Sequence, residues 1–311
     1  MAAKFALKFI IYLSCLLLLL FGLNKVAGFK QTHDSSENKW HELFNNEIQA
    51  EVIIIGASHA AAGINPKYLE HDGIRVFNFA LNGNNPRATL KWYKHFFREL
   101  YPKPRAIIYE VNWFLFDSDW LGFHIENASR YFPYQVYLKE LLNRDNDREM
   151  LILNRYPIFY NKISDFSVNQ GERIIDVEAN YYHGFTPDNG RQVNLDITRH
   201  ESTRNFAEQQ NAFNELLDLF KSDGIRVILV QAPEYLNGRN CDMIEKNNEY
   251  IRNVAKMKHL SFYNFNDELT TSINYDKNMY TDWGHLNMDG SAKFSRVLAE
   301  TLKDQMQKSV N

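Results

Sequence analysis

Short, uninterrupted apolar runs recur along this chain, and longer amphipathic stretches separate them. The runs lie at residues 51–56, 75–79, 106–111, 226–231 and, more weakly, 260–263. Because their apolar residues are continuous rather than alternating, they predict strands that are covered on both faces, as in a parallel sheet. Apolar residues at helical spacing occupy 87–100, 205–223, 247–258 and 291–307. Strands that alternate with helices predict an α/β fold, a three-layer doubly wound parallel sheet with right-handed crossovers.

The composition agrees with a folded body and excludes one class of partner. Of the 311 residues, 45% are hydrophobic and 23% are charged, which excludes a mainly disordered chain. The net charge is −3 at pH 7, so the chain lacks the basic footprint of a nucleic-acid binder. We therefore expect no nucleic-acid partner.

Residues 1–27 predict a membrane anchor or an export signal. Lysines precede the uncharged apolar run 9–23, and Lys25 follows it. The run reaches about 22 Å as a helix, short of a hydrocarbon core of roughly 30 Å unless flanking residues extend it and their lysines snorkel. A cleavage site at 26–28 is the alternative. We expect a protein held in the inner (cytoplasmic) membrane with its body extracytoplasmic, or one secreted to the periplasm.

The rest of the chain divides into a tether and one domain. Residues 28–48 are polar and mixed in charge, which predicts a tether, and residues 49–311 carry the α/β pattern. Within that domain, residues 117–200 have no clear period and predict an irregular insertion over one edge of the sheet. Cys241 is the only cysteine of the domain, so no disulfide can form inside it.

The residues that follow each predicted strand are the first candidates for chemistry, because ligands of open α/β sheets lie beyond the carboxyl ends of the strands. Ser58 follows the first strand in the sequence Gly-Ala-Ser-His and stands at a turn into a helix. It is either a nucleophile or a helix cap. His59 either assists it or lies on a solvated helix position.

Three further positions complete a possible acyl-transfer site. Gly83 follows the second strand and Asn112 follows the third, where a backbone N–H and an amide could stabilise an oxyanion. Asp282 and His285 lie three residues apart, just before the last helix. That spacing lets the carboxylate accept a hydrogen bond from Nδ1–H and leaves Nε2 free to accept a proton.

The order of these residues along the chain resembles that of the SGNH hydrolases, also called the GDSL-like esterase and lipase superfamily. The resemblance implies a flavodoxin-like, SGNH-type sheet. It also implies the site residues: a catalytic triad of Ser58, Asp282 and His285, and an oxyanion hole of Ser58, Gly83 and Asn112. The chain departs from the usual pattern twice. It has Gly-Ala-Ser-His where Gly-Asp-Ser is usual, and Glu-Val-Asn-Trp where Gly-x-Asn-Asp is usual.

The N-terminal segment and residues 64–66 and 231–238 are most similar to a membrane-attached branch of that superfamily. This branch contains the teichoic-acid D-alanyl-transfer protein and envelope-polysaccharide O-acyltransferases. The likeness implies an extracytoplasmic serine acyl esterase or O-acyltransferase that works through an acyl-serine on an envelope or extracellular glycan. Its partners would be a glycan or acylated small-molecule substrate and a membrane protein that donates the acyl group.

Two other interpretations of the site are possible from the sequence. One is a catalytically inactive SGNH-like protein that binds glycan or scaffolds an assembly, and another is a flavodoxin-like protein that holds a phosphate at the Ser58 turn. Trp113, Trp120 and His124 either line a sugar-binding cleft or belong to the core. We expect no metal and no nucleotide cofactor, because the sequence has neither a close His or Cys pair nor a glycine-rich phosphate loop.

Overall fold

A computed structural model describes nine ranges of the chain. They are residues 2–30, 36–116, 125–144, 146–156, 181–188, 206–235, 242–266, 271–274 and 276–307. The chain forms two compact units, residues 1–37 with 126–174 and residues 38–125 with 175–311.

The second unit is built on a five-stranded sheet in which every pair of neighbouring strands is parallel, in the order β2-β1-β3-β4-β5. Its strands are β1 (Val52–Ile55), β2 (Val76–Asn78), β3 (Ala106–Glu110), β4 (Arg226–Gln231) and β5 (Ser261–Asn264). All residues of β1, β2 and β3 are buried, as continuous apolar runs predict. The predicted α/β fold with a doubly wound parallel sheet is confirmed.

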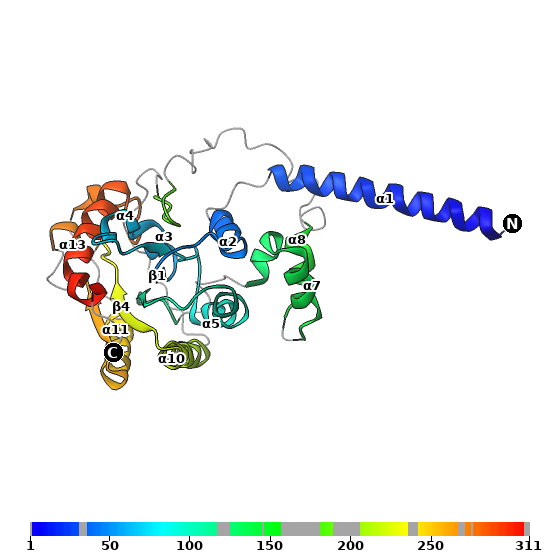
Figure 1. Ribbon diagram of the computed structural model, residues 1–311. Coiled ribbons are helices and arrows are strands. Elements are labelled where there is room, and N and C mark those ends of the chain that lie inside the picture. The colour runs from blue at the N-terminus through cyan, green and yellow to red at the C-terminus, as the bar shows by residue number, and fades with distance from the viewer. Residues whose placement is uncertain are drawn as a thin grey trace. The chain divides into compact units, whose positions relative to one another are not determined.

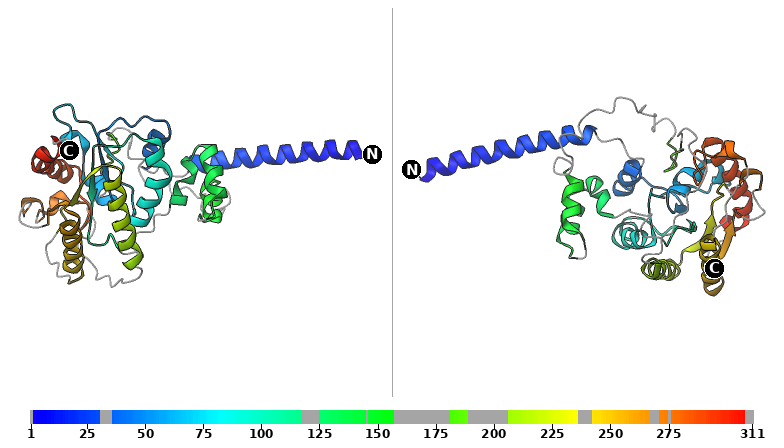
Figure 2. Two further views of the ribbon diagram at one scale, coloured as in Figure 1. Left: turned by 60° about the horizontal axis from the view of Figure 1, so that its bottom comes forward. Right: turned by 180° about the vertical axis from the view of Figure 1, so that it is seen from behind.

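Helices cover both faces of this sheet (Figure 1). One layer holds α3 (Ser58–Gly63), α4 (Pro66–Leu69) and α13 (Met288–Gln307). The opposite layer holds α5 (Pro86–Trp92), α10 (Phe206–Ser222) and α11 (Asp242–Lys258). Two short helices, α12 (Thr271–Asn274) and η6 (Lys277–Met279), precede α13. The layers are also visible from the other directions in Figure 2.

Apolar side chains fill the space between the sheet and the α13 layer. Ile54, Ile108 and Ile228 lie side by side on neighbouring strands, each with 0% exposure. They belong to one cluster with Phe294 and Leu298 of α13. Each fully buried side chain of this size contributes about 1.5–3 kcal/mol, so this layer holds α13 and the residues before it against the sheet.

The predicted helix at 87–100 is divided. It runs as α5, a π-helical segment η1 (Tyr93–Phe97) and a last turn α6 (Arg98–Leu100). The wider π turn places Tyr93, Phe96 and Phe97 in the core together.

The predicted tether is too long at its C-terminal end. Helix α2 (Ser36–Phe44) lies within it, and Trp40 is completely buried against the rings of Phe79 and Phe96. Lys39 Nζ donates to the carbonyl of Ala80 at 2.5 Å. The sheet-bearing unit therefore begins at residue 38 rather than 49.

The first unit contains helix α1 (Ala2–Lys30) and part of the predicted insertion. Residues 4–23 form the one helix, within the described chain, that is long and apolar enough to cross a membrane. The segment predicted to be irregular contains η2 (Ile125–Tyr131), α7 (Tyr134–Leu142) and α8 (Arg148–Arg155). The Arg155 guanidinium donates to the carbonyls of Ser129, Arg130 and Phe132, which ties α8 to η2. The rest of the predicted insertion, apart from residues 125–144, 146–156 and 181–188, lies outside the described residues.

Candidate active site

The turn after β1 presents Ser58 at the start of α3. Gly56 has a φ of +150°, and a Cβ there would lie 2.9 Å from Glu110 Cβ, so the turn requires glycine. Ala57 occupies the N-cap position and makes no side-chain cap. The interpretation of Ser58 as a helix cap is therefore wrong. As the first residue of α3, Ser58 has an N–H without an intrahelical acceptor.

The loop between η6 and α13 carries a histidine and a carboxylate that reach this serine. His285 Nε2 lies 2.7 Å from Ser58 Oγ, and His285 Nδ1 lies 2.7 Å from Asp282 Oδ2. The other Asp282 oxygen accepts the N–H groups of Gly284 and His285, both at 2.8 Å. The structure thus brings together the three residues predicted to form the triad, in the order that serine activation needs.

The charges of this pair are mutually stabilised. Burial raises the pKa of Asp282, but the hydrogen bond and charge of His285, together with two backbone N–H groups, lower it to about 2. Burial lowers the pKa of His285, but the hydrogen bond and charge of Asp282, with smaller effects of Asp188 and Glu234, raise it above 6.5. Asp282 therefore stays ionised and favours the imidazolium that would form during catalysis.

Asp188 is a second carboxylate at the site that the sequence did not indicate. Its Oδ2 accepts a hydrogen bond from Thr281 Oγ1 at 2.8 Å, and its backbone bridges to Asn287. Ligand atoms of Asp188, Asp282 and His285 lie within 4.8 Å of one another, a grouping that could hold a metal ion. However, the 2.7 Å contact between Asp282 Oδ2 and His285 Nδ1 is a hydrogen bond, so a metal would have to displace its proton.

The two other predicted oxyanion donors differ in their surroundings. Gly83 is half-buried in the turn after β2, with a φ of +68°. Asn112 is completely buried, and its Nδ2 donates to Glu110 Oε2 at 3.3 Å. Asn112 is thus tied to a neighbouring carboxyl group.

Buried polar side chains lie at the carboxyl ends of β3 and β4, next to the site. Glu110 and Gln231 are both 0% exposed, and Glu234 is 1% exposed. Burial, and then the charge of Glu234, raise the pKa of Glu110 to about 8, so Glu110 is protonated at neutral pH. His59 is 3% exposed, so its interpretation as a solvated helix residue is wrong.

Aromatic rings surround the turn that carries Ser58. Trp113 and Phe114 are each 4% exposed and form a small cluster with Ala57, against which the half-buried Trp283 packs. Trp113 is therefore a core residue rather than an open sugar platform. Trp120 and His124 lie outside the described residues.

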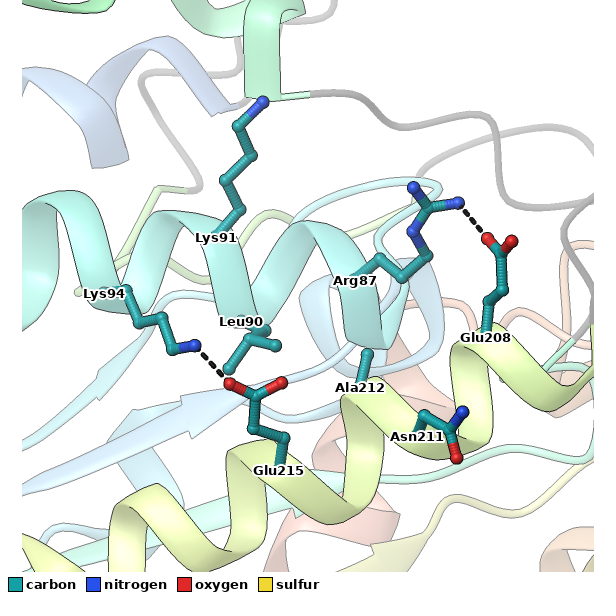
Figure 3. A pocket seen from close by; sticks show the side chains of 8 residues that line it. All are labelled: Arg87, Leu90, Lys91, Lys94, Glu208, Asn211, Ala212 and Glu215. Atoms are coloured by element: carbon teal, nitrogen blue, oxygen red, sulfur yellow. Dashed lines mark hydrogen bonds and ion pairs between the residues drawn. The ribbon is translucent and has the colours of Figure 1, made fainter. Parts of the chain in front are cut away.

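A surface hollow of about 490 Å³ lies elsewhere, between α5 and α10 (Figure 3). Ion pairs cross it, Arg87 with Glu208 at 2.6 Å and Lys94 with Glu215. Ser58, Asp282 and His285 are not among its lining residues. The hollow is therefore separate from the candidate active site.

Comparisons with known proteins find similarity in structure alone. No protein-family model matches the chain, and no curated protein matches it in sequence. Three of the similar solved structures follow. A protein from Streptococcus pneumonia named for platelet activating factor has a TM-score of 0.48 and 12% identity, over 92% of this chain and 98% of the other. A GDSL-like lipase from Bacteroides thetaiotaomicron has a TM-score of 0.42 and 11% identity, over 88% and 98%. An acetyl xylan esterase has a TM-score of 0.42 and 10% identity, over 82% and 98%.

Proposed function

We propose that this protein is a serine acyl esterase or O-acyltransferase that works through an acyl-serine at Ser58. The observation that carries the proposal is the continuous chain from Ser58 Oγ through His285 to Asp282, with both contacts at 2.7 Å. The order of Ser58, Gly83, Asn112 and the Asp-x-x-His motif along the chain supports it, because that order resembles SGNH hydrolases.

The geometry suggests the following reaction. Ser58 Oγ attacks the acyl carbonyl carbon while its proton passes to His285 Nε2. The N–H groups of Ser58 and Gly83 would donate to the oxyanion, and one such donor is worth about 3–4 kcal/mol of transition-state stabilisation. His285 then gives the proton to the leaving alcohol oxygen as its bond to the acyl carbon breaks. Water, or a sugar hydroxyl in the transferase, attacks the acyl-serine by the reverse sequence of proton transfers.

The proposed substrate is an acylated glycan of the envelope or the extracellular space. The apolar helix at residues 4–23 supports it, since such a helix is typical of a signal anchor or signal peptide. The α/β unit would then be held at the outer side of the cytoplasmic membrane or released into the periplasm. A transferase would also need a membrane partner that supplies the acyl group.

Labelling with a fluorophosphonate tests this function. We expect wild-type protein to be labelled at Ser58, Ser58→Ala to remain unlabelled, and Ser222→Ala, a change at an exposed serine of α10, to be labelled normally. His285→Ala should abolish hydrolysis of a small acyl ester, and adding Ser58→Ala should cost nothing more, because the residues act as one unit.

The scaffold alternative has one observation in its favour. Asn112 is buried and its amide donates to Glu110, so the oxyanion donor that the family pattern implies is engaged within the protein. Folded wild-type protein that reacts with neither a large nor a small phosphonate at any pH, and that still binds glycan after Ser58→Ala, would identify a scaffold.

A further inference from the structure

A second histidine–carboxylate pair lies buried against His285. His59 Nδ1 is 3.6 Å from Glu234 Oε1, and each of the two side chains is 1% exposed. The ring of His59 meets the ring of His285 at right angles, with 5.0 Å between their centroids. Because both side chains are enclosed by protein, His59 contacts the proposed catalytic base from the interior, with Glu234 behind it.

The ring of His59 is confined on its other sides as well. Phe114 contacts it edge-on with a centroid distance of 4.9 Å, and Trp283 lies at 6.1 Å. A Cβ at Gly284 would lie 2.5 Å from His59 Nε2. Only glycine at 284 therefore lets the loop that carries His285 approach this ring so closely.

The backbone of Glu234 is held by two asparagines, and that of the next residue is bonded to the loop that carries His285. Its N–H donates to Asn266 Oδ1 at 2.7 Å, and its carbonyl accepts from Asn274 Nδ2 at 3.1 Å. The following N–H, of Tyr235, donates to the carbonyl of Trp283 at 3.0 Å. The position of Glu234 is thus fixed relative to the segment between Asp282 and His285.

Other charged groups face these two histidines from several elements. Glu110, at the end of β3, lies close enough to Glu234 for the charge of Glu234 to raise its pKa, and Glu110 is neutral at pH 7. Asp282 and Asp188 face His285 from its own loop and from residues 181–188. Glu234 therefore adds a third carboxylate whose charge favours the protonated form of His285.

We propose that His59 and Glu234 are positioning residues that hold the imidazole of His285 in the orientation that accepts the Ser58 proton. The proposal rests on the proposed acyl-transfer function. The right-angled ring contact restricts rotation of the His285 ring, and small errors in the orientation of such a base are costly in rate. The charge of Glu234 favours the imidazolium that forms as Ser58 attacks.

Steady-state kinetics of the full-length protein in detergent test this role. We would measure kcat and KM for a small acyl ester from pH 5 to 9. In Glu234→Gln, which keeps the shape and removes the charge, kcat should fall about tenfold with little change in KM. The acid midpoint of kcat/KM should move down by about one pH unit, because a negative charge near His285 is lost.

A second variant separates the ring contact from the charge. His59→Asn keeps a polar side chain and the charge of Glu234 but removes the imidazole ring, so kcat should fall while the midpoint stays within about 0.3 pH unit of wild type. Glu208→Gln makes the same chemical change as Glu234→Gln at an exposed ion pair of α10 (Figure 3) and should leave both quantities unchanged.

The outcomes distinguish the two proposals. If both variants fold, as judged by an unchanged circular-dichroism spectrum, and keep kcat within about twofold and the wild-type midpoint, the positioning role is refuted. If Glu234→Gln does not fold, a kcat of His59→Asn within about twofold of wild type would by itself refute the positioning role. Wild-type protein that is not labelled at Ser58 would refute the acyl-transfer function itself, and the positioning role with it.

Discussion

Replacing Asp282 by Asn tests whether its charge, rather than its shape, supports the active site. In the folded protein the pKa of Asp282 is about 2 instead of 3.8. That difference corresponds to about 2 kcal/mol of stability. Because the folded-state pKa is depressed, this contribution is present above pH 3.8 and is lost as the pH falls towards 2. We expect Asp282→Asn to lower the free energy of unfolding by about 1–2 kcal/mol at pH 7 and by only about a third as much near pH 2.5, because the contribution is fully lost only below the folded-state pKa.

The same change should affect the reaction far more than the stability. An asparagine amide that donates to His285 Nδ1 places the proton on Nε2, where it blocks acceptance of the Ser58 proton. In a serine-protease triad this loss of the correct tautomer costs about 10⁴ in rate. We therefore expect fluorophosphonate labelling of Ser58 to slow by about three to four orders of magnitude.

Urea unfolding between pH 2.5 and 7, together with labelling rates at pH 8, would measure both effects. Asp276→Asn is the matched control, since Asp276 caps η6 through Asn278 N–H at 3.0 Å and asparagine caps a helix equally well. A labelling rate of Asp282→Asn within about tenfold of wild type would refute the assigned role of Asp282. A loss of stability that does not depend on pH would show that the charge is not its cause.

Three further outcomes are expected. Gly184→Ala should destabilise the α/β unit by more than about 3 kcal/mol, because its Cβ would lie 2.0 Å from a strand carbonyl. Gly73→Ala, with a similar positive φ but open space around it, should cost only about 1 kcal/mol, and denaturation midpoints compare the two. Glu110 has a pKa raised from 4.5 to about 8, so the unfolded state loses its proton first and stability should fall between those pH values. Thermal unfolding of Glu110→Gln should lack that fall, and a pH profile equal to wild type would contradict it. Finally, full-length protein should fractionate with membranes and a chain beginning at Phe29 should be soluble; recovery of the intact full-length chain from the cytoplasm would exclude the anchor.

Four of the five strands could be predicted because each contains a short apolar run between polar residues, whereas β5 (Ser261–Asn264) is half-buried over most of its length and has a weaker pattern. The boundaries of the helices are harder to predict from the sequence than the positions of the strands. The last helix was predicted from residue 291 and begins at Met288, where Asn287 Oδ1 accepts the N–H of Gly290. The sequence shows this asparagine cap directly. It gives no sign of the π turn at 93–97, because one added residue in a turn leaves the spacing of the apolar residues almost unchanged.

The insertion shows why periodicity fails for short helices. Helix α8 has eight residues, about two turns, too few to establish a period. Its position is set instead by the guanidinium of Arg155, which bonds three carbonyls of an earlier segment. Contacts of this kind depend on the folded chain and leave no pattern in the sequence.

Within the candidate site, the sequence predicts the residues that are marked by their immediate neighbours along the chain. Ser58 follows a strand, and Asp282 stands three residues before His285. Glu234 and Asp188 lie on other segments, and only the crossovers of the sheet bring them near His285. A single sequence carries no signal for such proximity, whereas His59 could be singled out by its place beside the serine.

The segment 181–188 is fastened to the α/β unit at both of its ends. Near its start, the carbonyl of His183 accepts the N–H of Asn78 at 2.8 Å, and at its end Asp188 is held by Asn287 and Thr281. These bonds come from β2 on one side and from the loop that carries His285 on the other. Residues of the α/β unit itself therefore hold the carboxylate of Asp188 beside His285.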